Sequence, residues 1–194
     1  MKHLNQIAEI RSGHPFRGKL ESSPKGNVSV LQLKDVTDSF TIDSQNASRI
    51  QLGAVKERYL VAPGDIVFRS RGQTNTCALV KELGGTTVVA APLFLIRATS
   101  DAVLPEYLCW YINQSAAQSY FNRNARGTAG RMIGRDTLEK LKIHLPPLEV
   151  QQNIVELAEL ASREQVLMAE LAKKKKYIVS QILMNRAKTQ GATP

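Results

Sequence analysis

Short apolar runs separated by turn-forming residues fill the first 147 positions of the chain. The runs are rich in β-branched side chains, and Gly, Pro, Ser and Asn interrupt them, for example at 12–15, 22–27 and 62–65. This pattern predicts short, mostly antiparallel strands. The strands are expected at 28–31, 65–68, 78–80, 86–89 and 93–96.

Two later stretches have the spacing of helices. A helix is expected over about 105–122, opened by a proline, with Leu108, Ile112 and Ala116 on one buried face. A shorter helix is expected over about 134–141, capped by the Asp-Thr pair near its start. Strands and helices of this kind predict a small α+β domain.

The pattern changes after residue 147, which predicts a division into an α+β domain over 1–147 and one long helix. From 148 to 188 the chain has neither Gly nor Pro, and good helix formers dominate. The last residues, 189–194, are expected to be a disordered tail. A helix of this length extends about 60 Å at about 1.5 Å per residue, more than its own domain would cover. We therefore expect it to pair with a partner helix.

The apolar positions of this helix follow a heptad repeat. Alternate steps of four and three from Val150 to Asn185 meet eleven positions, which we call the seam, and eight of them are apolar. Such a repeat is typical of a coiled coil. The seam residues expected at the helix contact are Leu157, Ala161, Glu164, Met168, Leu171, Lys175, Ile178 and Ile182.

Two charged seam positions favour an antiparallel pair of identical helices. If two copies pair about a point between Ala169 and Glu170, Glu164 of one copy faces Lys175 of the other, twice by symmetry. In a parallel pair each charge would face its own copy, which is repulsive. The apolar seam residues that then meet are Met168 and Leu171, Ala161 and Ile178, and Leu157 and Ile182.

The charge of the chain points to polyanions as partners. The net charge is +9, and residues up to Leu148 hold 19 Lys and Arg against 12 Asp and Glu, so the excess lies mostly in the domain. Such a balance is typical of, but not specific to, proteins that bind nucleic acids or anionic surfaces. No apolar run is long enough to span a membrane, and no signal-peptide core opens the chain, so a cytoplasmic location is expected.

The motifs of catalysis and metal binding are missing from the sequence. The three histidines are scattered, and no metal-ligand spacing, nucleophile elbow or phosphate-binding loop is present. Asp65 is the single acid between Arg58 and Lys81, which argues against a nuclease centre. Cys77 and Cys109 lack metal-binding spacing and are expected to be buried, reduced thiols. We expect no enzyme activity, no cofactor and no metal.

Arginine and amide side chains gather in two segments instead. Between Tyr107 and Arg135 there are four arginines and no acid, and residues 69–76 hold two arginines among amides and hydroxyls. Arginine binds phosphate or guanine, and Asn or Gln suits adenine, although a solvated basic loop would look similar. A weaker third candidate is the loop at 13–24. The candidate DNA contacts are Arg17, Lys19, Arg69, Arg71, Gln73, Asn75, Arg123, Arg126 and Arg131.

Several segments, in this order and spacing, resemble the specificity subunits of type I restriction–modification systems. Residues 4–13 are similar to the opening of a target-recognition domain, and 59–72, with Gly-Asp-Ile, to its central strand and loop. Residues 105–108, 127–135 and 138–143 resemble the distal half of that domain. The most specific match is LPPLEVQQNI at 145–154, which resembles the start of the family's spacer helix.

The resemblance implies a domain that reads one half of a bipartite site on double-stranded DNA. The helix would set the spacing and dock DNA adenine methyltransferase subunits, which would bind the methyl donor, and a restriction subunit could join them. Family members usually carry two recognition domains and two spacer helices, whereas this sequence has one of each. An antiparallel homodimer would restore the arrangement. The alternatives are a non-catalytic scaffold that assembles through its helix, and a nuclease with a metal site that the sequence conceals.

Overall fold

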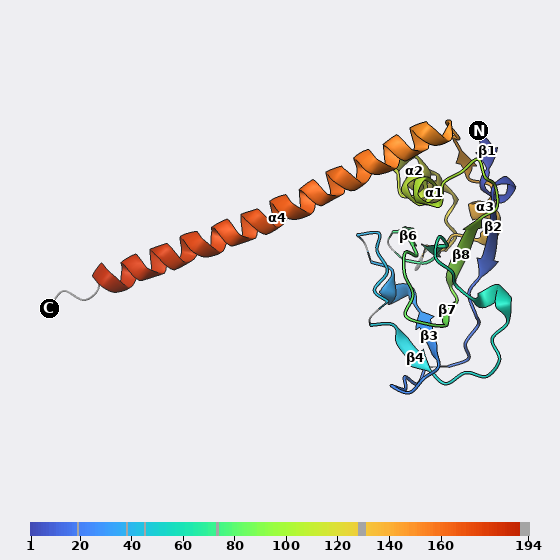
Figure 1. The fold of residues 1–194 in the computed structure, drawn as a ribbon, viewed down its shortest axis with the longest axis horizontal. Helices are drawn as coiled ribbons and strands as arrows, with labels where there is room; N and C mark the ends of the chain where they lie inside the picture. Colours follow the sequence, from blue (N-terminus) through green and yellow to red (C-terminus); the bar gives the residue numbers. More distant parts are fainter. Residues whose placement is uncertain (19, 38, 45, 73, 128–130, 191–194) are drawn as a thin grey trace. The chain divides into compact units, whose positions relative to one another are not determined.

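A computed structural model describes residues 1–18, 20–37, 39–44, 46–72, 74–127 and 131–190 of the chain (Figure 1). It divides into two compact units, Met1–Gln152 and Asn153–Pro194. Strands gather in the first unit and one long helix fills most of the second, which confirms the predicted α+β class. Among the described residues no helix is long and apolar enough to cross a membrane.

Among its described residues, the first unit contains three small sheets. The central sheet has four antiparallel strands in the order β2–β8–β5–β6. A second sheet has the order β4–β3–β7, in which β3 and β7 run parallel, and β1 pairs with β9. The strands are β1 Lys2–His3, β2 Ala8–Ser12, β3 Val28–Leu31, β4 Ser48–Ile50, β5 Ile66–Arg69, β6 Cys77–Leu79, β7 Thr87–Val89, β8 Leu93–Ala98 and β9 Lys142–Ile143.

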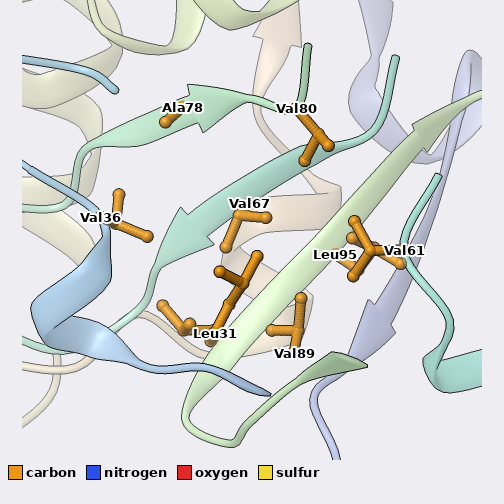
Figure 2. Packing of buried hydrophobic residues seen from close by; sticks show 9 residues of the cluster. Leu31, Val36, Val61, Val67, Ala78, Val80, Val89 and Leu95 are labelled. Atoms are coloured by element: carbon orange, nitrogen blue, oxygen red, sulfur yellow. The ribbon is translucent and has the colours of Figure 1, made fainter. Parts of the chain in front are cut away.

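All five predicted strands are present, as β3, β5, β6, β7 and β8. The core lies between the four-stranded and the three-stranded sheets (Figure 2). Val67 of β5 and Leu95 of β8 pack there with Leu31 of β3 and Val89 of β7. These side chains are almost wholly buried, because each strand faces the other sheet with β-branched or leucine side chains.

The prediction of one helix over about 105–122 is wrong, because the structure has two helices there. α1 spans Pro105–Ile112 and α2 spans Ser115–Asn124. The break lies at Asn113, whose side chain binds both the backbone N–H and the carbonyl of Cys77 at 2.9 Å. Asn113 thereby pairs with the outer edge of β6. The change of direction exposes Ala116, expected to be buried, and buries Ala117 and Phe121 instead.

The predicted short helix is present as α3, Arg135–Glu139, but its cap differs from the expectation. The residue before it is Gly134, and no side chain caps its first turn. Asp136, expected to be part of the cap, lies inside the first turn. A carboxylate there interacts favourably with the positive N-terminal end of the helix dipole. Short 3₁₀ turns also lie at Leu4–Gln6, Leu33–Asp35 and Glu57–Tyr59.

The long helix α4 spans Leu148–Gln190 without interruption. Its first turn belongs to the first unit, where Gln151 is fully buried. The Gln151 amide donates to the carbonyls of Ala102 and Pro146 at 2.8 Å, and its oxygen accepts from the N–H of Leu104 at 3.0 Å. The start of the helix is therefore fixed by buried hydrogen bonds.

Candidate nucleic-acid interface

The two arginine-bearing segments of the sequence meet in one small ribbon. Arg126 and Met132 exchange both backbone hydrogen bonds at 3.0 Å and so form an antiparallel bridge. On its other side Met132 pairs with Arg71, and the N–H of Ile133 donates to the carbonyl of Ser70 at 2.7 Å. We call residues 70–72, 126–127 and 131–133 the arginine ribbon.

The register of the ribbon places three side chains on one face. Arg71, Met132 and Arg126 are paired positions on adjacent strands, and paired residues of antiparallel strands project to the same side. All three are exposed. Successive side chains of a strand alternate, so Ile133 projects to the opposite side, where it is fully buried. The ribbon thus has an inner face in the core and an outer face carrying two cations.

The ribbon is held by buried side chains of the strands and helices beside it. The rings of Phe68 on β5 and Phe121 on α2 lie 5.2 Å apart, and each residue comes shortly before one of the two segments that form the ribbon. The Ser70 hydroxyl donates to the carbonyl of Pro92. Tyr120 of α2 donates to the carbonyl of Thr137 in α3 at 3.0 Å. The backbone that carries the outer arginines is therefore fixed by buried packing and hydrogen bonds.

Two further predicted residues belong to the ribbon or to the helix before it. A guanidinium nitrogen of Arg131, within the ribbon, donates to the side-chain oxygen of Asn122 in α2 at 3.3 Å. Arg123 is exposed in the last turn of α2, three positions before Arg126. The backbone pairing thus brings the segments of Arg126 and Arg131 together with that of Arg71.

Asn75 has a different role from the one expected. Its side chain is buried, and its amide donates to the carbonyl of Arg69 at 3.1 Å. The backbone carbonyl of Asn75 accepts a hydrogen bond from the side-chain amide of Gln118 at 3.0 Å. Asn75 therefore holds the loop against α2 instead of facing solvent. Arg69 is half-buried at the end of β5, and Gln73 lies outside the described residues.

The third candidate loop belongs to another part of the domain. Arg17 is exposed, and the preceding Phe16 packs on the cluster of Val28, Val30 and Ile50, which comes from the three-stranded sheet. The ring of His14 lies 4.3 Å from that of Phe16 in the same loop. Lys19 lies outside the described residues.

Asp65, the acid of the Gly-Asp-Ile segment, is part of the scaffold. It is buried, and its two oxygens accept from Nε and Nη2 of Arg97 at 2.6 and 2.7 Å. It also accepts from the N–H of Ala62 at 2.7 Å. The hydrogen bond with Asp65 raises the pKa of Arg97 above its ordinary value. Within the described ranges no group of three or more His, Cys, Asp or Glu is placed to bind a metal.

The two cysteines are buried, free thiols whose sulfur atoms lie 3.7 Å apart. Burial raises the pKa of Cys77 well above its ordinary value, and the neighbouring Cys109 acts in the same direction. The Cys77 thiol is therefore held in its protonated, unreactive form.

The seam of α4 is exposed from Leu157 to Asn185. Leu157, Met168 and Leu171 each expose more than three fifths of their surface, with values of 69%, 63% and 67%. The exposed apolar surface is wider than the seam, which sequence reasoning did not anticipate. A shallow groove on the helix is lined by Leu160, Arg163, Glu164, Leu167, Met168 and Leu171. Further exposed apolar residues are Val166, Tyr177, Val179, Leu183 and Met184.

The fold agrees with comparisons to known proteins. The chain belongs to the family of type I restriction modification DNA specificity domains, whose model matches residues 1–163. No curated protein sequence matches the chain.

Solved structures share the fold at low sequence identity. The HsdS subunit from Thermoanaerobacter tengcongensis has a TM-score of 0.62 at 19% identity, over 88% of this chain and 38% of that one. A chain from a structure of type I R-M complex assembly and conformational transition has a TM-score of 0.66 at 16% identity, over 93% and 42%. The S subunit from M. genitalium gives 0.54 at 11% identity, over 82% and 37%. The chain thus spans about two fifths of the length of these structures.

Proposed function

We propose that this chain recognises a specific DNA sequence as the specificity component of a type I restriction–modification system and catalyses no reaction itself. In this proposal it directs separate adenine methyltransferase subunits, and a restriction subunit where one is present, to a bipartite site. The arginine ribbon is the observation that carries the proposal, because it places arginines from distant segments on one exposed, anchored face. The family membership supports the same assignment.

The chemistry of the ribbon suits duplex DNA. Arginine forms bidentate hydrogen bonds with phosphate oxygens or with O6 and N7 of guanine. Phosphate contacts set the affinity and its salt dependence, whereas contacts with base edges set the sequence preference. We assign contacts of these kinds to Arg71, Arg123, Arg126 and Arg131, and a weaker contribution to Arg69.

Binding to a random-sequence duplex, measured by fluorescence anisotropy over a salt titration, tests the proposal. The full chain is measured alone and with its methyltransferase subunits. Removing one cation that neutralises a phosphate lowers the slope of log K against log salt by about 0.9. Arg71→Ala/Arg126→Ala should therefore lower the slope by up to about 1.8. Lys25→Ala/Lys56→Ala removes two exposed charges outside the ribbon and should leave the slope nearly unchanged.

The same measurement separates the proposal from a scaffold without DNA contact. A scaffold would show no salt-dependent binding, alone or with the methyltransferase. Magnesium-dependent cleavage of the duplex by the pure chain would instead reveal a nuclease. If the lysine pair lowers the slope as much as the arginine pair, the ribbon is not the DNA-binding face.

We further propose that two chains pair through α4 as an antiparallel homodimer, which would present two recognition domains to a palindromic bipartite site. The exposed apolar seam needs a partner, and the register that joins Glu164 to Lys175 also brings exposed Leu160 opposite exposed Val179. Sedimentation velocity tests it. Glu164→Lys should weaken the dimer, and adding Lys175→Glu should restore it. If neither variant changes the dimer, the register is different.

A further inference from the structure

One apolar side chain stands in the middle of the outer face of the arginine ribbon. Met132 is 45% exposed and pairs with Arg71 on one side and with Arg126 on the other. Its neighbour Ile133 supplies the anchoring contact in the core, so Met132 is not needed to bury the ribbon. An exposed methionine between two cations is an uncommon choice for a face that only attracts phosphate, because its thioether offers nothing to an anion.

We propose that Met132 is a specificity-determining residue that contacts the C5-methyl group of a thymine in the major groove. The proposal rests on the function proposed above. The edges of the bases carry hydrogen-bonding groups throughout the major groove, and the thymine methyl is the one apolar group among them. The apolar side chain of Met132 fits this methyl group. The arginines on either side of it bind guanine or phosphate.

The width of the ribbon supports an approach through this groove. The major groove is about 12 Å wide and admits a two-stranded ribbon. The segments that pair at Arg126 and Met132 are antiparallel at that position, as the strands of such a ribbon are, and neighbouring strands lie about 4.8 Å apart. Arg71 pairs with Met132 on the other side. With the two paired segments in the groove, Met132 and Arg126 face base edges, and Arg71 faces the phosphates at the rim.

Thymine-to-uracil replacement tests the contact, because it removes the methyl group and leaves base pairing intact. The probe is a duplex selected from a random library by the wild-type chain together with its methyltransferase subunits. Each thymine is replaced in turn, and Kd is measured by anisotropy. Burying one methyl is worth about 0.8 kcal/mol, so the affinity of the wild type should fall about fourfold at one thymine or more.

The variants connect this fall in affinity to Met132. Met132→Ala should bind the thymine and uracil duplexes equally at that position, and Met132→Gln, of similar length but polar, should do the same. Leu148→Ala is the matched control, since Leu148 is 44% exposed and lies outside the ribbon, and it should keep the fourfold difference. Thermal unfolding checks that every variant is folded.

The outcomes separate this inference from the proposed function. Absence of salt-dependent duplex binding by wild type overturns both. Sequence-specific binding with no sensitive thymine, or with no thymine in the selected site, overturns the contact and leaves DNA recognition standing. A Met132→Ala variant that keeps the wild-type preference for thymine over uracil overturns it as well.

Discussion

The buried carboxylate of Asp65 gives the sharpest test of how the domain is built. Asp65→Ala removes three accepted hydrogen bonds, two from Arg97 and one from the N–H of Ala62, all between 2.6 and 2.7 Å. Since the carboxylate is buried, water does not replace these hydrogen bonds on its side. The substitution therefore leaves the guanidinium of Arg97 and the N–H of Ala62 without the carboxylate that accepts their hydrogen bonds.

The expected cost follows from the exposure of each partner. Hydrogen bonds to charged groups are worth about 1.5–3 kcal/mol, but the Arg97 side chain is 34% exposed and regains water. Taking about 1 kcal/mol for each of the three hydrogen bonds gives a decrease of about 3 kcal/mol in the free energy of unfolding. With a slope of about 2 kcal/mol per molar urea, the midpoint should fall by about 1.5 M.

Urea unfolding followed by tryptophan fluorescence measures this decrease. The single tryptophan, Trp110, lies in α1 and so reports on the first unit, which also contains Asp65. Asp101→Ala, which removes an exposed acid, is the control and should shift the midpoint little. If the two variants behave alike, the pair of Asp65 and Arg97 does not stabilise the domain. A loss of DNA binding by folded Asp65→Ala protein would mean that the carboxylate acts at the interface.

Two further substitutions test other buried polar groups. Gln151→Ala removes a buried side chain that binds three backbone groups and should cost about 2–3 kcal/mol by the same measurement, whereas the exposed Asn153→Ala should cost little; equal effects would contradict a structural role. Burial raises the pKa of Asp35, although the hydrogen bond from the N–H of Gln32 acts in the opposite direction. The protonated carboxyl therefore contributes stability fully below the unfolded-state pKa, and this contribution is lost as the pH rises through the folded-state pKa. Asp35→Asn keeps an acceptor for the N–H of Gln32, so its free energy of unfolding should equal that of the wild type near pH 3 and exceed it at pH 7. If the difference in free energy of unfolding is the same at both pH values, the pKa of Asp35 is not raised.

Local pattern was sufficient for the strands that carry the core and for the long helix. The β-branched runs at Val28–Leu31 and Thr87–Val89 each face another sheet, so burial and composition agree. Other strands carried no such signal. β2 alternates buried Ala8 and Ile10 with charged Glu9 and Arg11, which pair with each other, and β4 is two polar residues and an isoleucine. Their strand conformation comes from partners far along the chain.

The break between α1 and α2 had no local signal either. Leu108 and Ile112 do lie on one buried face, but the next turn is redirected because Asn113 binds Cys77, which is 36 positions earlier. Helical periodicity describes an uninterrupted helix and does not report a side chain that pairs with a strand edge. The exposure of Ala116 and the burial of Phe121 both follow from that contact.

Polarity identified the segments of the candidate interface but did not assign the roles within them. Asn75 and Arg71 are both polar residues in one loop, yet Asn75 is buried against Gln118 and Arg71 is exposed. The pairing of Arg71 with Met132 joins positions distant in sequence, and no pattern within either segment indicates it. Met132, to which we assign a base contact, was not among the predicted contacts, because reasoning from charge and amides passes over apolar side chains.

The alternation within the ribbon has a consequence for specificity. Ile133 and the backbone hydrogen bond to Ser70 anchor the ribbon, whereas Met132, one residue earlier, projects outward. In the proposed interface, anchoring and recognition rest on different residues, so the outer residues could change without emptying the core. The same anchoring would lower the entropic cost of binding DNA, because the residues of the ribbon are already held in place. A recognition surface built in this way is expected to change its target by substitution at Arg71, Arg126 and Met132 while the fold beneath it keeps its stability.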